Sequence, residues 1–255
     1  MSTIVLNGKV LTVGGKALEY IQMPVKGDIV NLDLDGNGAK QYRVLSMNGN
    51  VAKVMTMYDD LTSVWNADTS KTTTINTLTV VRYEGSDIDT YLNTTWYNTL
   101  TSAAKAAIVL ESIVCDAWYY GNTGDPDYTG TYGESVHITD NYTISKYAGG
   151  TLNIGNRNVF ALSVQEVIDY LNDSSVQVDT TAILRNVNIW KMFWNDEVSH
   201  SIYPWLRSSY AGYSSSAWRV RGNVGGLNGI GVNNSSVVRP TLNLNLSLIP
   251  FTIAS

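Results

Sequence analysis

The chain has little of the chemistry on which most enzymes and disulfide-linked modules depend. Cys115 is its only cysteine, so no intramolecular disulfide can form and metal sites built from cysteines are excluded. His137 and His200 are its only histidines, and they stand far apart in the sequence. We expect both histidines to be structural and Cys115 to be a small core residue rather than a nucleophile.

Charge is also scarce. Charged residues make up 15% of the chain and apolar residues 44%, which is the opposite of the balance found in disordered proteins. Most of the surface must therefore consist of uncharged Ser, Thr, Asn and Tyr. The net charge is -5 and the 17 Lys and Arg residues are scattered, so nucleic acid is not an expected partner.

Long apolar runs are missing as well. No segment approaches the roughly 20 apolar residues of a membrane span, so we expect no membrane insertion. Residues 1–9 lack the basic and apolar regions of a signal peptide. We therefore expect a protein made in a cytoplasm, which would reach the outside by assembly onto a particle.

Turn signals divide the first sixty residues into short strands. Residues 1–24 alternate apolar and polar positions and predict two strands, forming an appendage for attachment or oligomerisation, or a cap on the domain. Residues 25–255 form the predicted ligand-binding domain. The acidic run from Asp33 to Gly38 resembles a calcium loop, but Leu45 stands where that loop needs Glu, so a hairpin turn is expected.

The middle of the chain changes to helical spacing. Ser86, Ser102 and the capping box from Ser163 to Glu166 are the expected helix starts. They predict helices at 87–92, 103–114 and 163–171, with an irregular helical piece at 181–196 and a long loop with short strands at 118–158. Because strands and helices are segregated along the chain, the predicted class is α+β.

Five motifs occur in order along the chain. They are Tyr42-Arg43-Val44-Leu45, Asp89-Thr90-Tyr91-Leu92-Asn93, Val159 to Val167, Trp205-Leu206-Arg207-Ser208 and Val238-Arg239-Pro240. With them the chain resembles, over roughly residues 25–246, a family of uncharacterised domains common in gut bacteria and their phages. The resemblance implies a C-type-lectin-like fold, as in formylglycine-generating-enzyme-like proteins, with short strands, two or three helices and a loop-rich C-terminal half. Oxidase activity in that group uses paired cysteines to bind copper, which Cys115 alone cannot do.

The same fold group includes the variable proteins of diversity-generating retroelements. In these proteins, mutagenesis directed at adenines alters a C-terminal segment, often at Asn, Tyr and Ser codons. Residues 209–236 are similar in placement and composition. The resemblance therefore implies, as a hypothesis, that this segment varies.

The segment 209–236 has the Tyr, Ser, Asn and Gly composition of a recognition surface. Its flanks are expected to be structural: Trp205 and Leu206 as core, Arg207 paired with a carboxylate or carbonyl, and Arg239 fixing a loop. Alternation should place Trp218 and Val220 on one face, with the neighbouring arginines facing out. The predicted ligand contacts, against the alternative of a solvated loop, are Tyr210, Tyr213, Ser215, Trp218, Arg219, Arg221, Asn223, Asn228, Asn233 and Asn234.

Acidic residues offer no clear site. Those of the loop 125–140, which are Asp125, Asp127, Glu134 and Asp140, could bind calcium, but a solvated loop is expected instead. Asp116, Glu134 and Asp196 show no spacing that singles out a glycosidase pair. No cofactor and no metal are therefore expected.

Together these features predict a non-enzymatic binding protein. The expected partner is a host cell-surface protein or glycan, and the expected setting is a phage virion, at a tail or head fibre. Homo-oligomers and contacts with other virion proteins through the N-terminus are expected. A capsid decoration protein and a bacterial surface adhesion module remain alternatives.

Overall fold

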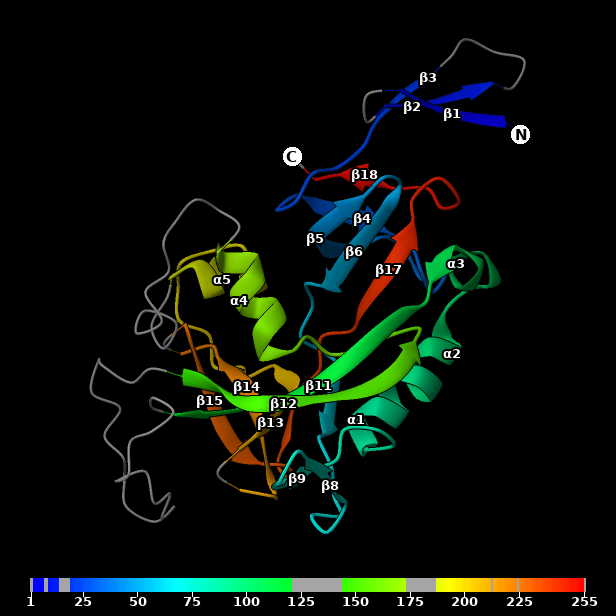
Figure 1. Ribbon diagram of the computed structural model, residues 1–255. Helices are drawn as coiled ribbons and strands as arrows, with labels where there is room; N and C mark the ends of the chain where they lie inside the picture. Colours follow the sequence, from blue (N-terminus) through cyan, green and yellow to red (C-terminus); the bar gives the residue numbers. More distant parts are fainter. Residues whose placement is uncertain are drawn as a thin grey trace.

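A computed structural model describes residues 2–6, 9–13, 19–120, 144–172, 187–211, 213–223 and 225–254 (Figure 1). The acidic loop 125–140 and His137 lie outside these residues. Strands make up 43% of the structure and helices 18%, so the protein is closer to all-β than to α+β. The longest described helix has nine residues. The prediction of an α+β, C-type-lectin-like fold is therefore wrong.

The larger sheet has six strands in the order β10-β17-β6-β5-β4-β18. Each neighbouring pair is antiparallel. Gly36 lies at φ 78° in the turn between β4 and β5, and its N–H donates to Asp33 Oδ1 at 2.8 Å, which confirms the predicted hairpin. The strands are β4 (Ile29–Leu32), β5 (Lys40–Asn48), β6 (Val51–Thr56), β10 (Ile108–Val109), β17 (Thr241–Asn245) and β18 (Thr252–Ile253).

The second sheet has five strands in the order β12-β11-β13-β14-β15. They are β11 (Glu111–Tyr120), β12 (Ile144–Arg157), β13 (Trp205–Tyr210), β14 (Ser216–Arg221) and β15 (Gly226–Gly231). β11 runs parallel to β13, and the other neighbours are antiparallel. The sheet thus joins strands from the middle of the chain to the C-terminal segment.

Two predictions for this region were wrong. The expected helix 103–114 already ends at Ala107, as α3 (Ser102–Ala107). The expected long loop with short strands at 118–158 contains the end of β11 and the whole of β12, which is 14 residues long, while residues 121–143 lie outside the described residues. From Ile113 to Cys115 the residues are alternately buried and exposed, with Val114 pointing outward. A period of two therefore replaces the helical period as soon as the alanine run ends.

Side-chain caps begin three of the described helices, α1 (Asp87–Thr90), α3 and α4 (Val164–Asn172). Ser86 Oγ accepts from Asp89 N at 3.3 Å, whereas α3 is capped by Thr101 rather than by the predicted Ser102. The capping box is confirmed, because Glu166 N donates to Ser163 Oγ and Ser163 N donates to Glu166 Oε2. The remaining helices are η1 (Tyr91–Trp96), α2 (Tyr97–Thr99) and α5 (Val187–Trp194).

Smaller sheets complete the fold. β7 (Thr62–Val64) pairs with β16 (Ser235–Val237), and β8 (Thr72–Ile75) pairs with β9 (Leu78–Val81). Residues 1–24 hold three strands instead of the predicted two: β1 (Ser2–Leu6), β2 (Lys9–Val13) and β3 (Glu19–Gln22). They form their own sheet at one end of the molecule (Figure 1). A role in attachment or oligomerisation stays a prediction.

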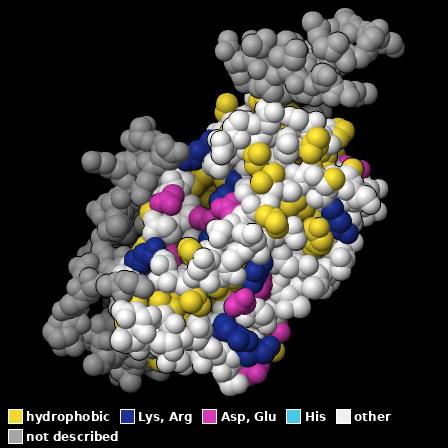
Figure 2. Space-filling view, turned by 45° about the vertical axis from the view of Figure 1, so that its right-hand side comes forward, with side chains coloured by type: hydrophobic (Ala, Val, Ile, Leu, Met, Phe, Trp, Pro, Cys, Tyr) yellow, Lys and Arg dark blue, Asp and Glu magenta, His cyan; other side chains and the backbone are white. Residues whose placement is uncertain are grey.

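Two main apolar cores lie on opposite sides of β13. Trp205 belongs to the larger core, which also contains residues of the six-stranded sheet and of α1 to α3. Leu206 belongs to the second core, between the five-stranded sheet and α4 and α5. Both side chains are 1% exposed, which confirms their predicted structural role. Outside these cores, charged side chains form small separate groups on the surface (Figure 2).

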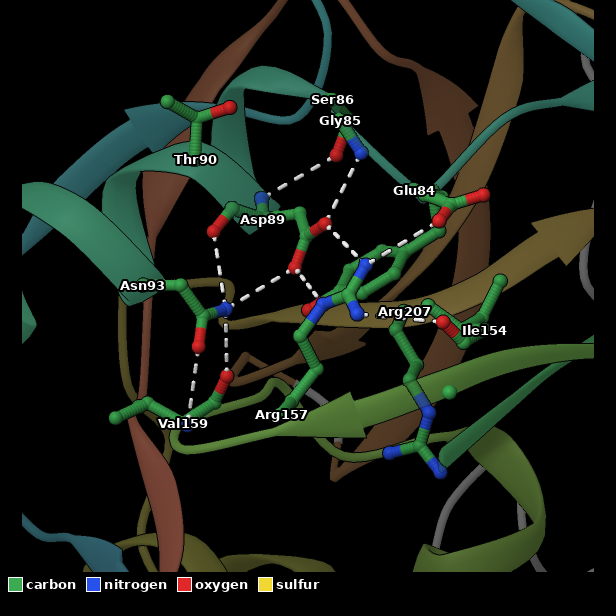
Figure 3. Close-up of polar contacts among 12 residues, drawn as sticks. Glu84, Gly85, Ser86, Asp89, Thr90, Asn93, Ile154, Arg157, Val159 and Arg207 are labelled. Atoms are coloured by element: carbon green, nitrogen blue, oxygen red, sulfur yellow. Dashed lines mark hydrogen bonds and ion pairs between the residues drawn. The ribbon is translucent and has the colours of Figure 1, made fainter. Parts of the chain in front are cut away.

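A polar network fixes the helical run to the second sheet (Figure 3). Arg157, at the end of β12, donates to the carboxylate of Asp89 from Nε at 2.9 Å and from Nη2 at 3.0 Å. Asn93 Nδ2 donates to Asp89 Oδ1 at 3.1 Å and to Val159 O at 2.9 Å. Bidentate pairs of this kind set orientation as well as energy. α1, η1 and the segment after β12 are therefore held together.

Arg207 is the centre of a second network. It pairs with Glu166 at 2.5 Å and donates to Val114 O and Ala161 O, each at 2.7 Å, as its predicted structural role requires. Lys53 binds the other side of Glu166 at 3.2 Å. Burial alone raises the pKa of Glu166, but the attraction of Arg207 and Lys53 outweighs burial and lowers it to about 2.

Replacing Glu166 by Gln keeps the capping geometry and removes the charge that faces Arg207. We expect the free energy of unfolding at neutral pH to fall by about 3 kcal/mol, because a buried cation loses its partner. Ionised Glu166 stabilises the fold fully above its unfolded pKa of 4.5, and this stabilisation is lost as the pH falls toward about 2. The difference between E166Q and the wild type should therefore shrink across that range in denaturant titrations.

Glu197→Gln is the matched control. Its pair with Lys191 is 2.6 Å long, but both side chains are more than half exposed. We expect a loss of less than about 1 kcal/mol. Equal losses in the two variants would contradict a special role for the buried pair.

Candidate binding surface

Backbone pairing places residues from three neighbouring segments on one face of the second sheet. Val220 N donates to Pro204 O at 2.8 Å and Gly222 N to Ile202 O at 3.1 Å, so Tyr203 lies opposite Arg221. On the other side, Arg221 is in register with Gly226. The next row along consists of Trp205, Arg219 and Asn228. The two rows point to the same side of the sheet, because positions two apart along a strand share a face.

The opposite side of these strands is buried. Val220 and Leu227 are 0% exposed in the second core, and Trp218 is also 0% exposed, with its indole N–H donating to Trp118 O at 3.1 Å. Tyr210 is 2% exposed, and its ring lies against Gly229, where a Cβ would meet it at 3.0 Å. The prediction of Tyr210 and Trp218 as ligand contacts is therefore wrong, because their faces of β13 and β14 point into the core.

The outward face carries four half-buried side chains, which we call the arginine face: Tyr203, Arg219, Arg221 and Asn228. The Arg219 guanidinium lies 4.4 Å from the centre of the Tyr203 ring, and its Nε donates to Asn228 Oδ1 at 3.1 Å. The guanidinium of Arg221 makes no hydrogen bond and no ion pair in the part of the chain that the structure describes. The predicted alternation, with Trp218 and Val220 inward and the arginines outward, is confirmed.

The other predicted contacts do not join this face. Tyr213 is half-buried and stacks on Tyr210 with ring centres 5.8 Å apart, and Ser215 lies beside it before β14 begins. Asn233 and Asn234 are exposed in the turn after β15, at the same end of the hairpin. The turn with exposed Asn223 is at the other end, about 20 Å away by strand length. The ten predicted residues thus do not form one surface.

Tyr203 was not predicted from the sequence. Pro204 interrupts the run of strand-forming residues, so the sequence indicates a strand only from Trp205 onward. Counting two residues back from Trp205 would have placed Tyr203 in phase with it. The backbone bond from Val220 to Pro204 shows that the pairing does continue across the proline.

Reactive groups elsewhere are used by the fold. Cys115 is 1% exposed, and burial raises the pKa of its thiol to about 12. His200 Nε2 forms a hydrogen bond with Asp196 Oδ1 at 2.9 Å, and its ring stacks on Trp194, so it has the structural partners expected of it. Within the described ranges, no group of three or more His, Cys, Asp or Glu could hold a metal ion. No described helix has the length and apolar character needed to cross a membrane.

The Arg239 side chain also has a structural place. It is 2% exposed, pairs with Asp59 and donates to Thr56 O at 3.1 Å. Its guanidinium lies 5.2 Å from the centre of the Trp194 ring. The prediction that Arg239 fixes a loop is consistent with these contacts.

Residues 52–246 match the model of a family that is described as a domain of unknown function, DUF6273. The matched region begins in the six-stranded sheet and contains all of the described second sheet and the arginine face. It agrees with the expectation of an uncharacterised domain family. No curated protein and no solved structure matches the chain.

Gly222 supports the arginine face through a close backbone approach. A Cβ at this position would lie 2.2 Å from Ile202 O and 2.8 Å from His200 O. We expect Gly222→Ala to lower the free energy of unfolding by about 1–3 kcal/mol, because backbone atoms must move to make room. At Gly231 a Cβ would meet only the side-chain amides of Asn233 and Asn234, so Gly231→Ala should cost clearly less. Chemical unfolding of the two variants checks this order, and the reverse order would contradict it.

Proposed function

We propose that this chain, which belongs to the DUF6273 family, is a non-enzymatic recognition protein that binds a partner on a cell surface through the arginine face. One observation carries the proposal: Arg221 is a half-buried residue whose guanidinium has no partner within the described structure, and it lies on a face whose reverse side is fixed in the core. A charge that no other group of the described structure neutralises can pair with an external partner without first breaking an internal contact.

The residue types of the arginine face support binding. Tyr and Arg are enriched where interfaces gain most of their free energy, and Asn adapts its hydrogen bonds to different partners. Arg219 is already oriented by its stacking on Tyr203 and its bond to Asn228. Fewer rotamers are therefore lost when a ligand binds.

The ionisable groups of the interior support binding over catalysis. The thiol of Cys115 has a pKa raised to about 12, so it is protonated and unreactive at neutral pH. Glu166 is held as a carboxylate between Arg207 and Lys53. The thiol thus lies in the core, and the carboxylate is already paired with two cations.

The setting that we propose is a phage particle, at a tail or head fibre, with residues 1–24 joining the protein to the particle or to sister subunits. A homo-oligomer would offset weak binding by each copy through multivalency. This setting rests on the sequence resemblance and on the recognition composition of 209–236.

The hypothesis that residues 209–236 vary makes different predictions for outward and for buried positions. If 209–236 varies, we expect substitutions at outward positions such as Arg221, Asn223 and Asn228, and invariance at Trp218, Val220 and Leu227. Replacing those buried side chains would cost about 2–5 kcal/mol each. Sequencing the gene from many isolates checks this, and changes spread equally over inward and outward positions would contradict it.

Surface substitutions test the binding function without damage to the core. We expect the combined change Arg219→Ala, Arg221→Ala and Asn228→Ala to weaken adsorption of labelled protein to host cells by at least about tenfold, since hot-spot residues contribute over 1 kcal/mol each. The control is Ser215→Ala, Asn233→Ala and Asn234→Ala, at the far end of the hairpin. Melting temperatures establish that both proteins fold.

The outcomes separate the alternatives. If only the control variant lost adsorption, the binding site would lie at the other end of the hairpin. Equal adsorption of all three proteins would remove the proposed role of the arginine face and favour a capsid decoration function.

A further inference from the structure

We propose that the arginine face binds the carboxylate of an acidic saccharide, with Arg221 as its main ligand. This inference rests on the proposed binding function and names the chemistry of the partner. It follows from the place of Arg221, from the side chains around it and from the charge of the surrounding protein.

Arg221 has the geometry that a carboxylate needs. Its row neighbours are Tyr203 on one strand and Gly226 on the other, and Gly226 has no side chain to cover it. The residue is half-buried, and its guanidinium has no partner among the described residues. A planar fork of N–H donors matches a carboxylate in two parallel hydrogen bonds, which are strongest where water is partly excluded.

The next row adds donors for a polar ligand. Asn228 Oδ1 is used by Arg219 Nε, so the side-chain NH2 of Asn228 is left to donate outward. Arg219 and Arg221 stand two residues apart on β14, and therefore on one face of the strand. A ligand that places its carboxylate on Arg221 would have hydroxyl groups within reach of Asn228.

The surroundings favour a single carboxylate over a polyanion. The chain has a net charge of -5, and the loop before Tyr203 contains Asp196 and Glu197. That loop reaches the turn after β14, because His200 N donates to Gly222 O at 3.0 Å. A densely charged polymer would meet these carboxylates, whereas one acidic group bound at short range gains the bidentate contact.

The same face favours a saccharide over an acidic protein. Trp218, Val220 and Leu227 of β14 and β15 are turned to the second core, and Ala217 and Ile230 pack in or against the larger core. Protein interfaces usually have an apolar centre that excludes water, and the arginine face offers none. It offers amide and guanidinium donors beside a tyrosine, which suit the hydroxyl groups of a sugar.

The test is calorimetric titration of the full chain with matched acidic and neutral sugars. The probes are galacturonate with its methyl ester, and sialyllactose with lactose, so that each acid carries one carboxylate. We expect at least one acid to bind with a Kd below about 1 mM and its neutral partner to bind at least tenfold more weakly. Arg221→Gln should lower the affinity for that acid by at least about tenfold, and Arg221→Lys should lower it less, because Lys keeps the charge but loses the fork.

Arg82→Gln is the matched control, since it removes the same charge from an exposed residue after β9. It should leave the affinity unchanged. Equal binding of acid and neutral partner, unchanged affinity in Arg221→Gln, or no binding of either acid below about 1 mM would overturn the inference. Tighter binding of a Glu-rich peptide than of either acid would overturn it in favour of a protein ligand.

Failure of this inference can be told from failure of the proposed function. If Arg219, Arg221 and Asn228 are needed for adsorption to cells but the acidic sugars do not bind, the recognition function stands and the ligand is of another class. If the triple variant adsorbs as well as the wild type, both proposals fall together.

Discussion

The buried guanidinium of Arg207 holds together the parts of the protein on which the surface depends. It joins β13 to the β11 backbone, to the extended segment at Ala161 and to the carboxylate at the start of α4. A cation this deep is costly unless every donor is matched, so the position of β13 has little freedom. The phase of β13 in turn sets which side chains of β14 and β15 face the core. The outward direction of Arg219 and Arg221 is thus a consequence of a contact made several strand positions away.

Alternation in the sequence was enough to predict which side chains of β14 share a face. It was not enough to predict which residues lie at the surface. Alternation correctly placed Trp218 with Val220 and opposite the arginines, and the capping box of α4 was found from two residues. Composition alone nevertheless suggested that Tyr210 and Trp218 contact a ligand. An aromatic residue suits a core as well as an interface, so residue type alone does not show whether its side chain points inward or outward. The register between β13 and β14 decides the matter, and that register is fixed by long-range pairing.

The wrong fold class has a similar origin. Ala103 to Ala107 have high helix propensity, and extending that helix to Val114 was consistent with local spacing. The backbone instead enters β11, which gains partners on both sides: β12 from later in the chain, and β13 from beyond residue 200. Neither partner can be inferred from the residues of β11 themselves. Strand formation there reflects tertiary context that overrides a weak helical preference.

The scarcity of charge makes the state of each arginine informative. Arg43, Arg157, Arg207 and Arg239 are all well buried or partly buried, and each donates to a carboxylate or to a backbone carbonyl. Each of these guanidinium groups therefore has acceptors inside the fold, although Nε of Arg43 and of Arg239 is buried without one in the described structure. Arg221 is half-buried, and its guanidinium has no such acceptor within the described structure. On the proposed function, a ligand from outside the chain supplies the acceptor that the Arg221 guanidinium lacks between Tyr203 and Gly226.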